Sequence, residues 1–307
     1  MTTVMAASAN AAIGFPAGMA ILANGGSAID AVVATIAAVE ANPDDHSVGY
    51  SGLPNLLGEV ELDASIMDGS TLAAGSVGAL QMHQDAIMAA RRVMEQLPHV
   101  LIVGSGATRF ADEQGLPAAN LLTPEAEAIW RSRLDPESGE DTLYVGKVRE
   151  LVAKLASDPE MPDEVHGTVN VMAKDAAGHI CCGVSTSGWA WKYPGRLGDS
   201  PIIGAGNYAD DRYGAAACTG RGEMAQRLCT AHTVVTAMRF GMSLQEALEL
   251  AARDLVHLDD AYKSEVNIVA IDRDGHHGGA TTAPDKTYIF QTPGMAIHEE
   301  RERTVIK

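Results

Sequence analysis

The sequence predicts an α+β fold in which helices and sheets form separate layers. Segments with helical periodicity and segments with strand character are grouped along the chain, and the stretch after Thr168 is especially rich in strands. A doubly wound α/β fold would instead alternate strand and helix one by one. The length of 307 residues suits one large domain or two small ones, and it is ample for burying a core.

Helices are predicted where apolar residues recur every three to four positions. The first runs from Phe15 to Leu22 and ends at Asn24-Gly25-Gly26, a glycine-rich C-terminal signal. Ser27 then caps the second helix, with Asp30 in its first turn. Further helices are predicted at 87–97, from Thr123-Pro124-Glu125 onward, at 145–155, at 221–240 and after the capping residue Ser243.

Strands are predicted from alternating patterns and from short apolar runs. The segments 168–174 and 179–185 flank a turn and predict a hairpin, so that Thr168 begins one strand and Thr186 closes its antiparallel neighbour. The run 100–103 is entirely apolar and predicts a buried strand. Other strands are predicted at 59–67, 202–208, 214–219, 266–271 and, as the last strand, 288–290.

Composition excludes several classes of function. The net charge of −18 opposes binding to nucleic acid or to anionic membranes, because both need a basic surface. No run approaches the ~20 apolar residues of a membrane span, and the first residues lack the basic segment of a signal peptide. Four cysteines do not make a disulfide framework in a chain of this length. We therefore expect a cytoplasmic protein, with Cys181 and Cys182 facing opposite sides of a strand as core thiols.

No metal or cofactor is predicted. His276-His277 has no Cys or carboxylate at a spacing that would complete a metal site, and a solvated turn explains it better. Gly204-Ala205-Gly206 is too short for a nucleotide loop, and no complete Gly-x-Gly-x-x-Gly unit lies at a strand–helix junction.

The peptide bond between Gly167 and Thr168 is the first candidate for chemistry. A threonine at a chain terminus carries its own base, because an α-amino group titrates near ~8. Glycine before it permits backbone conformations that would expose the Gly167 carbonyl to the Thr168 hydroxyl, giving self-cleavage by an N-to-O acyl shift. The polar, Pro-rich segment 158–163 predicts a mobile linker just before this bond. By itself, a Gly-Thr pair is a weak signal that more often marks an ordinary strand start after a loop.

Three more residues carry hydroxyl or backbone donors near this strand pair. Thr186 could hydrogen-bond the hydroxyl or amine of Thr168 across the hairpin, or simply fill the strand as a β-branched residue. Thr219 and Gly220 end a strand just before a helix, where they could receive a developing oxyanion. Alternatively, Thr219 is a helix N-cap, and Glu223 is a first-turn acid favoured by the helix dipole.

Arg196 and Asp199 lie three residues apart in a glycine-framed loop. A guanidinium matches a carboxylate, and a carboxylate receives an ammonium, so the two would hold both ends of an α-amino acid. The alternative is a surface ion pair worth at most about 1 kcal/mol. Trp189 and Trp191, in the preceding loop, could form the wall of a substrate pocket or cover the edge of the core.

Taken in order, these motifs resemble those of the N-terminal-nucleophile asparaginase family, which holds glycosylasparaginases, plant-type asparaginases and isoaspartyl peptidases. The matching stretches are HGTV at 166–169, STSG at 185–188, GRLGDSPIIGAG at 195–206, YADD at 208–211 and GAAACTGRGE at 214–223. Upstream, GGSAIDAV, the SVGYSGLPNLLGEVELDASIMDG run and PHVLIVGSGATRFADEQG are also similar. The likeness covers nearly the whole chain and is closest to the glycosylasparaginase branch.

The resemblance implies a four-layer αββα sandwich in one domain, residues 1–307. It also implies self-cleavage into an α chain, 1–167, with a linker at about 135–165, and a β chain, 168–307, paired as a dimer of αβ heterodimers. Carried over by motif, the nucleophile is Thr168, with support from Thr186. The substrate's α-carboxylate and α-ammonium bind Arg196 and Asp199. The oxyanion hole is Thr219 with Gly220.

The implied reaction hydrolyses the side-chain amide of an N4-substituted asparagine, a small molecule, through a β-aspartyl ester. Two features depart from the glycosylasparaginase branch: Gly167 stands where that branch has Asp, and residues 5–10 contain no Trp. An isoaspartyl peptidase with asparaginase activity is therefore the second hypothesis. A protein of another class, an uncleaved and inactive amino-acid-binding protein, is the third.

Overall fold

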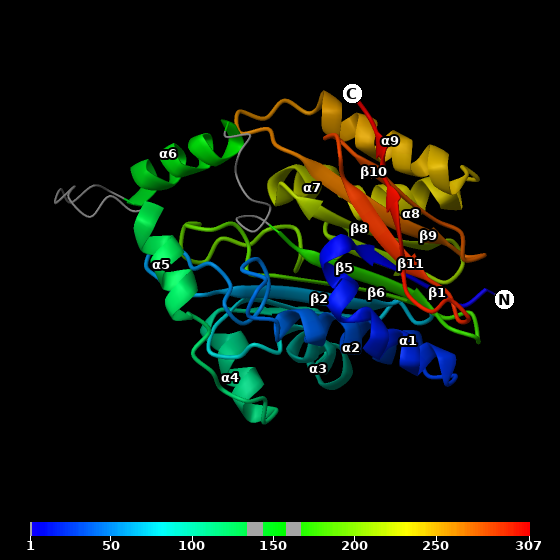
Figure 1. Ribbon diagram of the computed structural model, residues 1–307, viewed down its shortest axis with the longest axis horizontal. Helices are drawn as coiled ribbons and strands as arrows, with labels where there is room; N and C mark the ends of the chain where they lie inside the picture. Colours follow the sequence, from blue (N-terminus) through cyan, green and yellow to red (C-terminus); the bar gives the residue numbers. More distant parts are fainter. Residues whose placement is uncertain (1, 134–143, 158–166) are drawn as a thin grey trace.

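The structure is a computed structural model that describes residues 2–133, 144–157 and 167–307. Its described residues form a mixed α+β fold built on two sheets (Figure 1). The eight-stranded sheet has the order β12-β11-β1-β5-β6-β2-β3-β4, and the five-stranded sheet has the order β13-β10-β9-β8-β7. The strands are β1 Val4–Ser8, β2 Leu62–Asp68, β3 Ala74–Leu80, β4 Leu101–Val103, β5 Val169–Lys174, β6 Ile180–Thr186, β7 Asn207–Asp210, β8 Gly214–Gly220, β9 Val266–Asp272, β10 His277–Thr281, β11 Thr287–Gln291, β12 Glu299–Glu302 and β13 Thr304–Val305.

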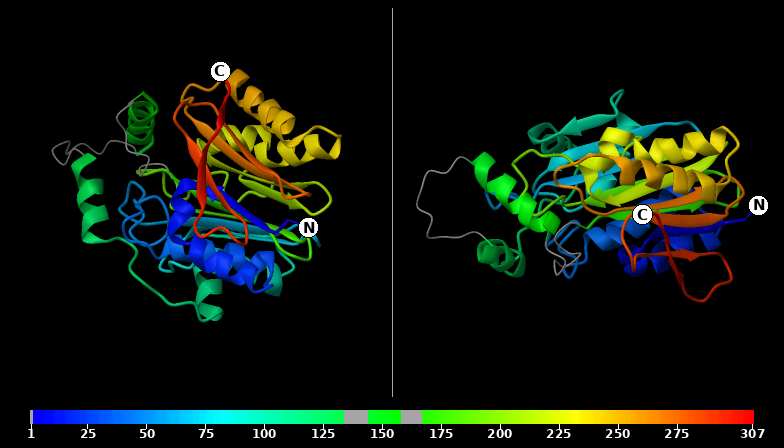
Figure 2. Two further views of the ribbon diagram at one scale, coloured as in Figure 1. Left: turned by 45° about the vertical axis from the view of Figure 1, so that its right-hand side comes forward. Right: turned by 90° about the horizontal axis from the view of Figure 1, so that it is seen from above.

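Helices cover the outer faces of the two sheets (Figure 2). α5 and α6 lie apart from these, together at one end of the molecule (Figure 1). The helices are α1 Phe15–Ala23, α2 Ala28–Glu40, α3 Ala86–Gln96, α4 Ser105–Glu113, α5 Pro124–Arg133, α6 Tyr144–Ser157, α7 Gly222–Leu228, α8 Thr230–Arg239 and α9 Leu244–His257. The predicted linker segment 158–163 lies outside the described residues.

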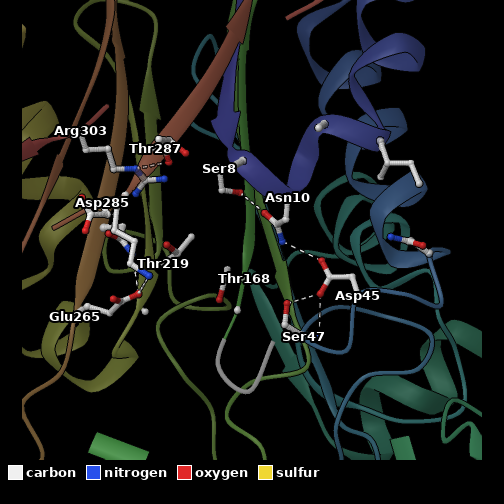
Figure 3. A pocket seen from close by; sticks show the side chains of 18 of the residues that line it. Ser8, Asn10, Asp45, Ser47, Thr168, Thr219, Glu265, Asp285, Thr287 and Arg303 are labelled. Carbon is white, nitrogen blue, oxygen red and sulfur yellow. Dashed lines mark hydrogen bonds and ion pairs between the residues drawn. The ribbon is translucent and has the colours of Figure 1, made fainter. Parts of the chain in front are cut away.

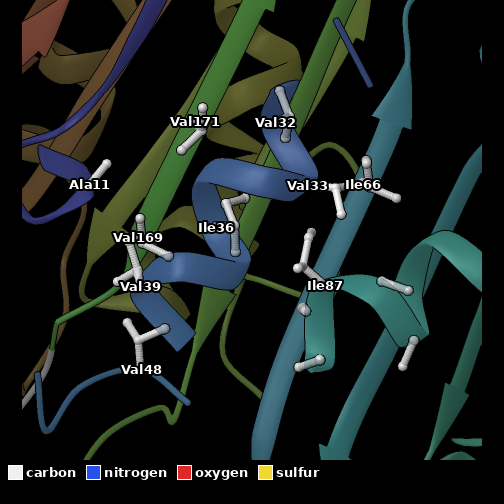
Figure 4. Close-up of a cluster of buried hydrophobic side chains, with 14 of the residues drawn as sticks. Ala11, Val32, Val33, Ile36, Val39, Val48, Ile66, Ile87, Val169 and Val171 are labelled. Atoms are coloured by element: carbon white, nitrogen blue, oxygen red, sulfur yellow. The ribbon is translucent and has the colours of Figure 1, made fainter. Parts of the chain in front are cut away.

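Three apolar clusters hold these layers together. In the first, α2 and α3 pack on the large sheet, with Ile36 fully buried against strand residues such as Val169 and Val171 (Figure 4). In the second, α8 and α9 cover the small sheet. The third lies between the two sheets. Cys181 belongs to the first cluster and Cys182 to the third, which confirms that the two thiols face opposite sides.

The predicted hairpin is at the centre of the large sheet. β5 and β6 pair antiparallel, with Val169 opposite Ser185, so Thr168 directly precedes β5 and Thr186 ends β6. Asp175 fixes the turn, because its Oδ1 accepts hydrogen bonds from the backbone N–H groups of Ala177 and His179 at 2.9 and 3.0 Å. The strand-end residues that sequence reasoning singled out are therefore brought together by local turn chemistry.

The predicted helix starts are also confirmed. The Ser27 hydroxyl accepts a hydrogen bond from the Asp30 N–H at 3.1 Å, capping α2. Ser243 and Glu246 form a complete capping box at the start of α9. Such caps are worth about 1 kcal/mol each.

The single helix predicted at 221–240 is wrong. The chain breaks at Cys229, which adopts a left-handed conformation with φ 48°, and α7 and α8 are separate helices. The break lets the first N–H groups of α8 bind elsewhere: those of Ala231 and His232 donate to the carbonyls of Ala205 and Gly204. The helical periodicity of the sequence continues on both sides of Cys229, so the periodic pattern alone does not reveal the break.

Several strand predictions also need correction. The apolar run 100–103 gives an edge strand, β4, and not a buried one: Leu101 and Val103 are 40% and 48% exposed. In the segment 202–208 only its end is in β7, because 202–206 forms turns. The strand predicted at 288–290 is not the last, since β12 and β13 follow it. His277 begins β10 and stacks on Phe290 at 3.8 Å, so only His276 fits the predicted solvated turn.

Candidate active site

Thr168 lies where the two sheets approach each other, and it is only 8% exposed. Thr168 lines two cavities. A small cavity, lined also by Arg196 and Asp199, has a volume of about 10 Å³ that water can enter. A large cavity, lined also by Thr219, Asn10 and residues of both sheets, has about 510 Å³. Figure 3 shows Thr168 between the two walls of the large cavity.

Thr186 holds the carbonyl of the residue before Thr168. Its Oγ1 donates a hydrogen bond to the Gly167 oxygen at 2.8 Å, and accepts one from the Gly188 N–H at 2.8 Å. The sequence predicts a bond to the hydroxyl or amine of Thr168 itself, but the hydrogen bond goes to the carbonyl oxygen of the preceding residue, Gly167. A donor at this oxygen polarises the carbonyl of the Gly167–Thr168 bond.

The loop Gly195–Asp199 brings Arg196 to the small cavity, but its ion partner is Glu223. Nε and Nη2 of Arg196 donate to the two oxygens of Glu223 at 2.9 and 2.8 Å. Although burial disfavours the charged form, Glu223 outweighs it and raises the pKa of Arg196. Nη1 donates to no described residue. A Cβ on Gly198 would lie 3.0 Å from Nη1, so glycine keeps this nitrogen open.

Asp199 is 4% exposed, and no other described residue hydrogen-bonds its carboxylate. Burial raises the pKa of Asp199 to about 7, although the positive charge of Arg196 opposes the shift. A buried carboxylate without a partner is costly unless a cation joins it. The surface ion pair of Arg196 with Asp199, the alternative from the sequence, is wrong: Asp199 is buried, the side chain of Arg196 is only 17% exposed, and Arg196 is paired with Glu223.

Thr219 and Gly220 end β8 beside Thr168. The N-cap of α7 is Arg221, without a side-chain cap bond, so the alternative that Thr219 is a helix cap is wrong. Gly220 has φ 106°, and a Cβ there would lie 2.3 Å from the Glu265 carbonyl oxygen. Only glycine fits this position, which lines both cavities.

The two tryptophans take different roles. Trp189 lines the small cavity, and the guanidinium of Arg221 lies over its ring at 4.5 Å. Trp191 is buried in a cluster with α5 and α6, and its indole N–H donates to the Trp130 carbonyl at 3.2 Å. Both thus belong to the same buried apolar cluster, and Trp189 also forms part of the wall of the small cavity.

Sequence reasoning missed one wall of the large cavity. Ser8, Asn10, Asp45 and Ser47 form a hydrogen-bonded chain there (Figure 3): Ser8 Oγ donates to Asn10 Oδ1 at 2.8 Å, and Asn10 Nδ2 donates to Asp45 Oδ2 at 3.1 Å. Asp45 Oδ1 accepts from the N–H and hydroxyl of Ser47 at 2.9 and 2.5 Å. Ser8 and Asn10 lie at the end of β1 and in the turn of helix that follows it, whereas Asp45 and Ser47 lie in the segment after α2, and no local motif signals the contact between these two segments.

A buried lysine and a buried acid near the site were also missed. Lys192 Nζ donates to the carbonyls of Glu61 and Ser187 at 2.9 and 3.1 Å, and burial lowers its pKa. Glu40 accepts a hydrogen bond from the Ser185 hydroxyl at 2.6 Å, and burial raises its pKa to about 8. Through Ser185 and Ser187, both residues support the end of β6 around Thr186. A single Lys in a loop or a single Glu at a helix end does not predict such a contact from sequence.

A buried threonine beside an open guanidinium nitrogen and an unpartnered carboxylate defines a site for a small amino-acid derivative. Comparison with known proteins identifies the family. The model of the Asparaginase family matches residues 5–297. The chain belongs to this family.

No helix in the described part of the chain is long and apolar enough to cross a membrane.

Three relatives with different names illustrate the range of this family. The chain is 37% identical over 290 residues to N(4)-(beta-N-acetylglucosaminyl)-L-asparaginase of Elizabethkingia miricola, covering 90% of this chain and 80% of the relative. It is 35% identical over 261 residues to isoaspartyl peptidase/L-asparaginase of Danio rerio, covering 84% and 77%. It is 38% identical over 272 residues to plant-type L-asparaginase of Pyrococcus horikoshii, covering 88% and 85%.

Proposed function

We propose that this protein is a self-processing amidohydrolase that cleaves the side-chain amide of N4-substituted asparagines, as the name of the Elizabethkingia miricola relative suggests. The observation that carries the proposal is the position of Thr168. It lies between a small cavity with opposite charges for an amino acid and a large cavity for whatever is attached to the side-chain amide.

Self-cleavage comes first in this mechanism. The Thr168 hydroxyl attacks the Gly167 carbonyl, and the C–N bond breaks to give an ester and to free the Thr168 amine. Water then hydrolyses the ester, which separates the two chains and restores the hydroxyl. The hydrogen bond from Thr186 at 2.8 Å supports this step, because it stabilises negative charge on the Gly167 oxygen. The products are an α chain, 1–167, and a β chain, 168–307, of one domain with a four-layer αββα sandwich.

Cleavage would also open the small cavity. Its volume of about 10 Å³ holds roughly one water molecule, which is too little for an α-amino acid. Gly167 lines this cavity, and severing its bond to Thr168 frees it to move away. Self-cleavage thus produces the nucleophile's base and admits the substrate together.

Catalysis then uses the freed site. Nη1 of Arg196 binds the substrate's α-carboxylate and Asp199 binds its α-ammonium, which orients the side-chain carbonyl toward Thr168. The Thr168 amine, with a pKa near ~8, takes the hydroxyl proton during attack and passes it to the leaving amine. Thr219 and Gly220 stabilise the oxyanion. Water then hydrolyses the β-aspartyl ester and releases aspartate.

A second candidate function is that of an isoaspartyl peptidase with asparaginase activity. Gly167 and the similarity to the Danio rerio relative favour it. The third, an uncleaved amino-acid-binding protein, would keep Arg196 and Asp199 without turnover. We also propose a cytoplasmic dimer of αβ heterodimers, to be measured by light scattering of the processed protein.

The test compares the parent protein with Thr168→Ala and Thr168→Ser. Mass spectrometry should find fragments 1–167 and 168–307 in the parent and only the full-length chain in Thr168→Ala, which should also lack turnover. Thr168→Ser keeps a hydroxyl and should cleave and turn over more slowly. Activity of an intact 307-residue chain would overturn the mechanism, and a stable intact chain that binds aspartate without turnover would favour the binding protein.

Assays of glycosyl-asparagine, a β-aspartyl dipeptide and asparagine on the same processed sample rank the two enzymatic candidates. We expect the highest kcat/KM for glycosyl-asparagine. Hydrolysis of the dipeptide alone would reverse the order.

A further inference from the structure

The large cavity bears on which leaving groups the enzyme accepts, and the inference rests on the proposed function. A β-aspartyl amide has its α-carboxylate and α-ammonium on one side of the scissile carbonyl and its amine on the other. If Arg196 and Asp199 bind the first side in the small cavity, the amine extends past Thr168 into the large cavity. Its volume of about 510 Å³ exceeds what ammonia needs by far.

The described lining of the large cavity carries more negative than positive charge. Four carboxylates, those of Asp44, Asp45, Glu265 and Asp285, face two cations, Lys286 and Arg303. Figure 3 shows Arg303, Asp285 and Glu265 on one wall and Asp45 on the other, with Thr168 between them. Any charged group attached to the leaving amine therefore enters a field of net negative sign.

Both cations are already engaged. Lys286 Nζ lies 3.1 Å from Glu265 Oε1, and the Nε of Arg303 donates to the Thr287 carbonyl at 2.9 Å. Burial lowers the pKa of Arg303 to about 10, which leaves it charged at neutral pH. Arg303 is 6% exposed, and its Nη1 has no hydrogen-bond partner among the described residues but is buried away from solvent, so a carboxylate in the cavity does not reach it. Neither cation is presented as an open fork for a carboxylate.

The lining instead offers partners for neutral polar groups. Asn10, Asn267, Ser8 and Thr287 contribute amide and hydroxyl groups, whereas apolar side chains are few. Exposed Asp44 and Asp285 add carboxylate acceptors at the rim. Hydroxyl and amide donors of a leaving group find acceptors here, whereas a carboxylate finds like charge.

We propose that the large cavity selects the leaving group by charge: it accepts neutral, hydroxylated or basic amines and discriminates against amines that bear a carboxylate. Asp44 and Asp285 are the residues to which we assign most of this discrimination, because their side chains are not built into the wall. Asp45, held by Asn10 and Ser47, contributes its charge but also shapes the cavity.

The sharpest test uses two substrates that differ only in charge, β-aspartyl-leucine and β-aspartyl-leucinamide. The kcat/KM of the amide should exceed that of the acid by roughly three- to tenfold at low ionic strength, given two net charges at several ångströms in a solvated cavity. The ratio should shrink toward one as NaCl is raised, a response that a purely steric preference would not give.

Asp44→Asn and Asp285→Asn should each bring the ratio of kcat/KM for the amide to kcat/KM for the acid closer to one, and the double variant should bring it closer still. Asp274→Asn is the matched control: its side chain is 67% exposed and does not line the large cavity, so the ratio should stay unchanged. An equal or higher kcat/KM for the acid overturns the charge selection, while hydrolysis of glycosyl-asparagine in the same sample leaves the proposed function intact. Failure on all three substrates counts against the proposed function itself.

Discussion

The two cavities beside Thr168 handle charge in opposite ways. In the small cavity, no other described residue hydrogen-bonds the Asp199 carboxylate, and Nη1 of Arg196 is open beside Gly198. In the large cavity, Asp45, Glu265, Lys286 and Arg303 are bonded to other residues of the wall, and the unpaired Nη1 of Arg303 is buried away from solvent. The small cavity is thus prepared for a ligand with an ammonium and a carboxylate, whereas most charges of the large cavity are already paired within its wall.

This difference suggests a division of labour. The Asp199 carboxylate is costly to bury without a cation, and a ligand with an ammonium removes that cost, while its carboxylate binds the open nitrogen of Arg196. The wall of the large cavity gains little from any single contact, so volume and net charge decide what fits. Recognition of the aspartyl half should therefore be strict, and recognition of the leaving group permissive.

The largest effect is expected from Arg196→Ala. It removes the partner of the substrate's α-carboxylate and leaves Glu223, whose side chain is 31% exposed, with Arg221 as its remaining described partner, at 3.2 Å. Removing one partner of a desolvated charge pair between protein and ligand typically costs about 2–5 kcal/mol, so kcat/KM should fall by roughly 10²- to 10³-fold. Steady-state kinetics on asparagine would measure this fall.

Arg227→Ala is the matched control for Arg196→Ala. Arg227 pairs with Asp260, but its side chain is 49% exposed, and such a pair is worth about 1 kcal/mol or less. Its kcat/KM should stay within about twofold of the parent. If both variants lost activity equally, Arg196 would have no special place in binding.

The next effect is a pH dependence carried by Asp199. Its carboxylate must be ionised to bind an ammonium, and burial raises its pKa to about 7, so activity should fall as pH drops through 7. The Thr168 amine must also be neutral, with a pKa near ~8. Log kcat/KM should therefore rise with a slope near two below pH 7 and near one between 7 and 8. Asp199→Asn should lower activity and leave log kcat/KM with a slope of one at every pH below the pKa of the amine.

Glu40→Gln separates this titration from one in the core. Burial raises the pKa of Glu40 to about 8, but Glu40 lies against Ser185 and not in either cavity. The folded state then holds a proton that the unfolded state releases above about pH 4.5, so stability falls as pH rises from 4.5 to 8. Glu40→Gln should flatten the stability profile yet keep the slope of two in kcat/KM. A changed slope would mean that the core acid, and not Asp199, sets the activity profile.

The same contrast explains how far the sequence could predict this molecule. The β5–β6 hairpin and the caps at Ser27 and Ser243 were predictable because their signals are local. Arg196 and Asp199 were identified as a pair from spacing and resemblance, but the bidentate partner Glu223 was not, since it is 27 residues away on another element. β1 and β12 were missed because their sequences, one Ala-rich and one charged, carry little strand signal: β1 is a strand through pairing with β11 and β5, and β12 through pairing with β11.

The smallest effect is expected in the wall of the large cavity. Asn10→Ala removes the hydrogen bonds to Ser8 and Asp45, each worth about 1 kcal/mol, without uncovering a buried charge. A bulky leaving group that touches this wall should lose roughly three- to tenfold in kcat/KM, and asparagine, whose leaving group is ammonia, should lose less. Measuring glycosyl-asparagine and asparagine side by side tests this. A loss as large as that of Arg196→Ala on both substrates would mean that the wall positions Thr168 itself, and the division between a strict and a permissive cavity would not hold.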